Sequence, residues 1–86
     1  MNSRDRLVIA IAQLNPAVGD IPGNAAKVRA ARKEAAAGGA HLAVFPELFI
    51  AGYPPEDLVL KTAFQAACRT EIEALARETA DGGPAM

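Results

Sequence analysis

Residues 42–58 read LAVFPELFIAGYPPEDL, and residues 42–45 have the apolar, partly β-branched composition of a buried strand. Pro46 lacks an N–H and ends the ladder hydrogen bonding, so Glu47 is the first ionisable side chain after this strand. Ligands of open α/β sheets bind beyond the carboxyl ends of the strands. Glu47 is therefore a candidate general base, partly desolvated by apolar neighbours. The alternative is a carboxylate that turns into solvent.

The chain before this strand predicts a strand, a loop and a helix. Leu7–Ala12 is continuously apolar, which is typical of a strand buried on both faces of a mainly parallel sheet. Residues 15–23 are rich in proline and glycine and predict a loop without the spacing of a phosphate cradle. Asn24 is the expected cap of a helix over Ala25–Ala37, which ends at Gly38-Gly39. Strand, helix and strand in this order indicate a βαβ unit.

The chain after the quoted stretch predicts a second helix over Ala63–Thr79. Cys68 falls on its apolar face, and we expect it to be a small core side chain rather than a nucleophile. Residues 81–86 read as a turn followed by the start of another strand. Apolar positions of the second helix recur at three- and four-residue steps and predict a buried face: Phe64, Cys68, Ile72, Leu75 and Thr79.

Composition excludes several kinds of partner. The 86 residues can form one small domain, with 51% hydrophobic residues and a net charge of −1. Because the basic residues are dispersed, neither nucleic acid nor an anionic membrane surface is expected as a partner, and no run is long enough to span a bilayer. His41 has no Cys or His at ligand spacing, so no metal site is expected. The single cysteine excludes an internal disulfide and fits the cytoplasm.

The residues Phe45-Pro46-Glu47-Leu48, followed by Gly52-Tyr53, resemble the first catalytic motif of the nitrilase, or carbon–nitrogen hydrolase, superfamily. Residues 54–58 make the stretch similar to the glutaminase domains of glutamine-dependent NAD synthetases. The opening of those domains resembles residues 11–15, 18–20 and 23–24. The resemblance implies that residues 1–6 are an N-terminal extension. Residues 7–86 are then a carbon–nitrogen hydrolase domain, truncated on its C-terminal side.

The resemblance also implies a fold and a site. The α/β chain would be the N-terminal βαβα portion of an αββα sandwich, and therefore incomplete. Glu47 corresponds to the general base of a Glu–Lys–Cys triad, and Tyr53 to an aromatic residue of the glutamine pocket. The Lys and the Cys lie beyond residue 86 in the family, and neither Lys61 nor Cys68 takes their place. The chain alone is therefore predicted to be inactive.

The function that this resemblance implies is that of a glutaminase segment. The whole domain would hydrolyse the side-chain amide of glutamine and supply ammonia for amidation of the adenylated nicotinate dinucleotide in NAD biosynthesis. This segment would need no cofactor. ATP and Mg²⁺ would bind to a synthetase domain that is its partner. The whole protein is expected to be a cytoplasmic homo-oligomer. Glu56 and Asp57 are expected to support the turn that follows Tyr53. Two alternatives are another nitrilase-type amidase or carbamoylase, and a non-catalytic α/β module.

Overall fold

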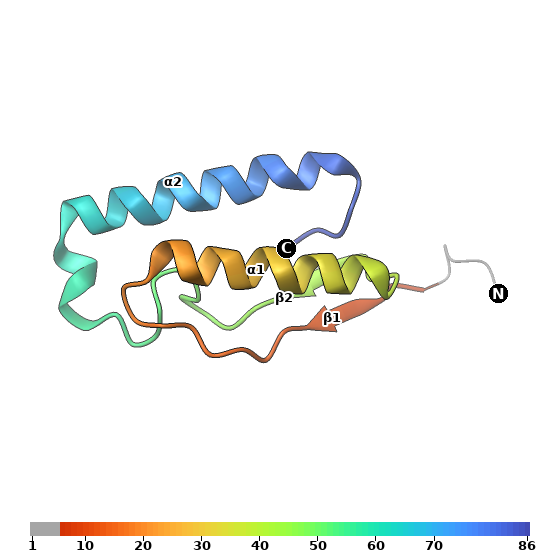
Figure 1. Cartoon of the computed structure of the whole chain (residues 1–86), viewed down its shortest axis with the longest axis horizontal. Coiled ribbons are helices and arrows are strands. Elements are labelled where there is room, and N and C mark those ends of the chain that lie inside the picture. The colour runs from red at the N-terminus through yellow and green to blue at the C-terminus, as the bar shows by residue number, and fades with distance from the viewer. Residues whose placement is uncertain (1–5) are drawn as a thin grey trace.

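The structure, a computed structural model, describes residues 6–86, so the expected extension at residues 1–6 lies outside the described residues except for its last position. Strands β1 (Ile9–Ile11) and β2 (Leu42–Val44) pair in parallel, with Ile9 opposite Leu42 and Ile11 opposite Val44. Helix α1 (Ile21–Ala37) connects them, as Figure 1 shows. The βαβ unit expected from the sequence is therefore present. The rest of the chain forms a 3-10 turn η2 (Glu56–Leu60), helix α2 (Thr62–Glu78) and a 3-10 turn η3 (Thr79–Asp81).

The two helices lie on the same side of the strands. In Figure 1, α1 lies between α2 and the strand pair, and it contacts both α2 and β2. The core forms where α1, α2 and the segment after β2 meet, with Phe45, Phe64 and Cys68 partly buried around it. Its buried members are Ile21, Ala25, Val28, Phe49, Ile50 and Leu75.

The start of α1 differs from the sequence-based prediction. The helix begins at Ile21, four residues earlier than predicted, and its cap is Asp20, whose Oδ1 accepts a hydrogen bond from the Gly23 N–H at 3.1 Å. A Cβ on Gly23 would lie 2.1 Å from the Asp20 Oδ2, so a larger residue there would displace the capping carboxylate. Asn24 is not the cap, because its side chain is fully buried and bonded elsewhere.

The strands are less buried than predicted. Helix α1 covers one face of the pair, where Ala43 is 1% exposed, but the opposite face is open. On that face Ile9 is 48% exposed and Ile11 is 72% exposed. The expectation of a strand buried on both faces is therefore wrong for this structure, because only one layer of helices packs against the sheet. A large apolar surface is left in contact with water.

The apolar face of α2 is also only partly covered. Leu75 is buried, Phe64 and Cys68 are half-buried, and Ile72 is 51% exposed. Periodicity identified the correct side of the helix, but the prediction that the whole face is buried is wrong. The reason is that α1 covers only part of α2.

The turn expected near the end of the chain leads to an isolated bridge rather than to a strand. Ala85 forms a parallel bridge with Leu42, on the edge of β2 that β1 does not occupy. Among residues 6–86, no helix is both long and apolar enough to cross a membrane.

Candidate functional site

Glu47 lies beyond the carboxyl end of β2, in a turn over residues 47–51, which is the position expected from the sequence. Its side chain is exposed, and it has no hydrogen bond or ion pair with any residue in the range 6–86. It lines neither the cavity of about 770 Å³ beside α2 nor the cavity of about 420 Å³ beside β1. The expected partial desolvation of Glu47 is therefore absent from this structure.

The apolar neighbours of Glu47 explain this exposure. The rings of Phe45 and Phe49 lie 5.9 Å apart at an angle of 55°, and both line the larger cavity on the core side of the turn. Phe49 is only 4% exposed. Since both rings pack inward, they do not cover the carboxylate that lies between them in the sequence. The turn is thus anchored by aromatic side chains and presents Glu47 outward.

The backbone of this turn is held in an unusual conformation. Leu48 has a φ of 54°, in the left-handed region that a bulky side chain rarely adopts. The Leu48 carbonyl accepts a hydrogen bond from the Gly52 N–H at 2.9 Å, which closes the turn. Such a conformation persists only where surrounding contacts enforce it, and outliers of this kind cluster at functional sites. It occurs directly beside the candidate base.

Asn24 and Gly52 connect this turn to the loop between β1 and α1. The Asn24 Oδ1 accepts the Ala17 N–H at 2.8 Å, while its Nδ2 donates to the Ala17 carbonyl at 2.8 Å and to the Ile50 carbonyl at 3.0 Å. Gly52 has a φ of 85°, and a Cβ there would lie 2.5 Å from the Ala17 oxygen. Gly19 adds a hydrogen bond from its N–H to the Ala51 carbonyl at 2.9 Å.

These contacts give a role to residues that the sequence analysis had assigned only to a loop and a cap. The resemblance at positions 18–20 and 23–24 marked these residues as part of the family's pattern. It could not show which distant backbone groups their side chains and glycines contact. The structure shows that they fix the segment carrying Glu47 against the first loop. They are positioning residues rather than chemical ones.

Tyr53 lies on the surface immediately after this connection. It is 58% exposed and lines neither large cavity of the described chain, and its peptide bond to Pro54 is cis. Glu56 and Asp57 form the first turn of η2, without a side-chain capping hydrogen bond. The structure thus places Glu47 and Tyr53 on one exposed segment, and their roles as base and pocket residue stay predictions.

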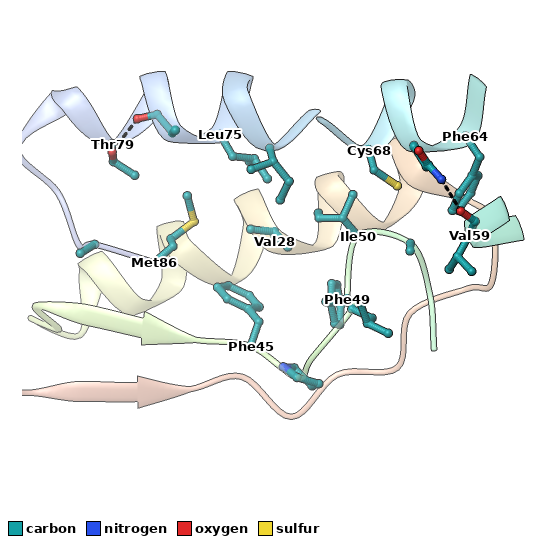
Figure 2. A pocket seen from close by; sticks show the side chains of 17 residues that line it. Val28, Phe45, Phe49, Ile50, Val59, Phe64, Cys68, Leu75, Thr79 and Met86 are labelled. Atoms are coloured by element: carbon teal, nitrogen blue, oxygen red, sulfur yellow. Dashed lines mark hydrogen bonds between the residues drawn. The ribbon is translucent and has the colours of Figure 1, made fainter. Parts of the chain in front are cut away.

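The larger cavity, of about 770 Å³, is an apolar space next to this segment (Figure 2). It lies between α2, α1 and the residues after β2, and the last residue, Met86, also lines it. Its polar side chains are internally bonded: Gln65 donates to the Val59 carbonyl, and the Thr79 hydroxyl donates to the Ala76 carbonyl. The cavity therefore presents no acid–base group other than the Cys68 thiol.

Cys68 extends from α2 on the side that faces Ile50 (Figure 2). It is half-buried, so the expectation of a core position holds only in part. Burial raises the pKa of the Cys68 thiol above its ordinary value, which disfavours the reactive thiolate. Pro46 and Leu48 line the same cavity but Glu47 does not, so the structure does not bring this thiol and the candidate base together there.

His41 contacts the segment before β1, because its Nδ1 accepts the Val8 N–H at 2.9 Å. No group of three or more His, Cys, Asp or Glu side chains suited to a metal ion occurs within residues 6–86.

The described chain is therefore a parallel βαβ unit with an exposed glutamate just beyond its second strand. The chain belongs to the carbon–nitrogen hydrolase family, whose model matches residues 8–83. It is 46% identical over 82 residues to the glutamine-dependent NAD(+) synthetase of Rhodobacter capsulatus, covering 95% of this chain and 15% of that protein. It is 45% identical over 78 residues to the corresponding synthetase of Thermotoga maritima, covering 91% of this chain and 14% of that protein. The Aquifex aeolicus synthetase is 38% identical over 73 residues, 85% of this chain and 13% of that protein.

The chain is thus similar to only about a seventh of each of these relatives. Its two parallel strands and two helices are consistent with part of a carbon–nitrogen hydrolase fold.

Proposed function

We propose that this chain is the front segment of a glutaminase domain that supplies ammonia for NAD synthesis, and that Glu47 is its general base. The observation that carries the proposal is the placement of Glu47: an exposed carboxylate, unpaired within residues 6–86, at the carboxyl end of β2 on a braced turn. The match of residues 8–83 to the carbon–nitrogen hydrolase family supports it. So does the similarity to glutamine-dependent NAD(+) synthetases.

In the proposed reaction, Glu47 accepts the proton of a cysteine thiol that lies outside this chain. The thiolate then attacks the side-chain carbonyl of glutamine, and a lysine, also outside this chain, stabilises the tetrahedral oxyanion. Glu47 then gives this proton to the amide nitrogen, so that ammonia leaves when the carbon–nitrogen bond breaks. Water cleaves the resulting thioester to glutamate and the free thiol. Tyr53 contributes to the pocket that receives the glutamine. ATP and Mg²⁺ belong to the synthetase domain in this proposal, and this segment binds neither.

The exposure of Glu47 agrees with such a divided site. A base that must reach a nucleophile on another part of the domain has to be presented outward, and it gains its desolvated surroundings only when that part is in place. The open face of the strand pair, with Ile9 and Ile11 exposed, supplies an apolar surface for the second sheet of an αββα sandwich. The complete protein would be a cytoplasmic homo-oligomer.

The proposal can be tested in a chimera with a related synthetase. The matching segment of the Rhodobacter capsulatus synthetase is replaced by this chain, to which it is 46% identical over 82 residues. NAD formation is then measured with glutamine and, separately, with free ammonia as the nitrogen source. We expect Glu47→Gln to abolish the glutamine-driven reaction and to leave the ammonia-driven one intact. Equal loss of both, or loss of neither, would contradict the proposal.

A further inference from the structure

Arg32, on α1, holds the turn before Ala85 by three hydrogen bonds. Its Nη1 and Nη2 donate to the two carboxylate oxygens of Asp81, at 2.9 and 2.7 Å, and its Nε donates to the Pro84 carbonyl at 2.8 Å. This two-pronged contact with a carboxylate is the geometry for which a guanidinium is suited and an ammonium is not. The Arg32 side chain is only 12% exposed.

The contacts of Arg32 adjoin the point where strand pairing begins. Pro84 is buried and has no N–H to donate, and its carbonyl is taken by Arg32. The next residue, Ala85, pairs with β2: its N–H donates to the His41 carbonyl at 3.0 Å, and its carbonyl accepts the Ala43 N–H at 2.8 Å. The guanidinium therefore fixes the residue directly before the first ladder bond.

The intervening turn is shaped around the guanidinium. Gly82 has a φ of 81°, in the left-handed region, and the Gly83 N–H donates to the Asp81 Oδ1 at 2.8 Å. A Cβ on Gly83 would lie 2.8 Å from the Arg32 Nη2. Because glycine has no Cβ, position 83 leaves room for the Arg32 guanidinium.

Other arginines of the helices do not have this combination of contacts. Arg29 binds Glu71 and Glu78 across the two helices with its side chain 40% exposed. Arg69 binds Glu73 four residues along α2 and is 83% exposed. An exposed single pair such as that of Arg69 contributes little to stability. Arg32 differs because it is mostly buried and bonds a backbone carbonyl beside the sheet.

We propose that Arg32, together with Asp81, sets the register in which Ala85 pairs with β2. A shift of one residue in a strand moves each side chain to the opposite face of the sheet, so register must be specified where pairing begins. The turn residues alone cannot specify it, because Gly82 and Gly83 are adjacent and permissive. Arg32 specifies it by holding both ends of the turn from a separate element. It is a positioning residue and touches no substrate.

Amide hydrogen exchange of the 86-residue chain tests this role. Arg32→Met keeps most of the aliphatic stem but removes the donors, and Arg32→Lys keeps the charge but cannot bind Asp81 and Pro84 together. Arg69→Met is the matched control, since it removes an exposed ion pair. The readout is protection of the Ala43 and Ala85 amides, which form the two hydrogen bonds of the bridge between Ala85 and β2.

We expect both Arg32 variants to lose protection at these two amides by about tenfold or more, while Arg69→Met does not. The amides of His41 and Ala12, which bond between β1 and β2, serve as the internal reference and should keep their protection. Unchanged protection in Arg32→Met would overturn the proposal. Parallel loss at the reference amides would also overturn it, because Arg32 would then support general stability rather than register. So would a lack of protection at Ala43 and Ala85 in the unmodified chain.

Discussion

Replacing Asn24 by alanine removes the side chain that ties the Glu47 turn to the first loop. Asn24 is fully buried and makes three hydrogen bonds, two with the backbone of Ala17 and one with the carbonyl of Ile50. A hydrogen bond of this kind contributes about 0.5–1.5 kcal/mol, and the backbone groups left behind lose their partners inside the protein. The expected loss is therefore about 3 kcal/mol of unfolding free energy.

Urea unfolding followed by circular dichroism measures this loss. With a slope of about 1–3 kcal/mol per molar urea, the midpoint should fall by about 1–3 M, or the folded state should vanish if its stability is smaller than that. Asn15→Ala is the control, because Asn15 is exposed and its side chain has no hydrogen bond within residues 6–86. A change below about 0.5 kcal/mol for Asn24→Ala, the range of ordinary surface substitutions, would refute the reasoning.

Gly52→Ala should lower the free energy of unfolding in urea by about 2 kcal/mol more than Gly39→Ala does. Both glycines have left-handed φ values, but only at Gly52 would the new Cβ lie 2.5 Å from a backbone oxygen. Equal losses would contradict this. The Arg32 hydrogen bonds hold the pKa of Asp81 below its ordinary value, so its stabilisation is complete above about pH 4 and is lost as pH falls further. Asp81→Asn should therefore flatten unfolding free energy against pH below about pH 4, and an unchanged acid slope would count against the pairing. The 86-residue chain alone should release no ammonia from glutamine. Ammonia release that is lost in Cys68→Ala would contradict this, because Cys68 would then be the nucleophile.

The order of elements could be predicted from the sequence because it depends on local pattern. The apolar runs gave β1 and β2, and helix formers between Pro22 and Gly38 gave α1. The cap was mistaken because Asp20 and Asn24 are both good capping residues. Tertiary contacts distinguish them, because the Asn24 amide donates hydrogen bonds to the Ala17 and Ile50 carbonyls. Sequence spacing does not reveal these partners.

Burial was overestimated for a related reason. Periodicity shows which side of α2 is apolar, but how far that side is covered depends on what packs there, so Leu75 is buried while Ile72 is not. For the candidate site, Pro46 was enough to place Glu47 beyond β2. Its exposure depends on the inward packing of Phe45 and Phe49, which a one-dimensional pattern cannot give.

The most direct test of the account is the rate of ammonia release from glutamine by the chimera with the Rhodobacter capsulatus synthetase. Three forms are compared: the unmodified chimera, Glu47→Gln, and the control Glu34→Gln, which removes an exposed carboxylate of α1. Loss of a general base costs about 10²–10⁴ in rate, and more where base and nucleophile act as a unit. The account predicts a loss of at least about 10² in kcat for Glu47→Gln and none for Glu34→Gln. A Glu47→Gln chimera that keeps its rate within a few-fold of the unmodified form would contradict it.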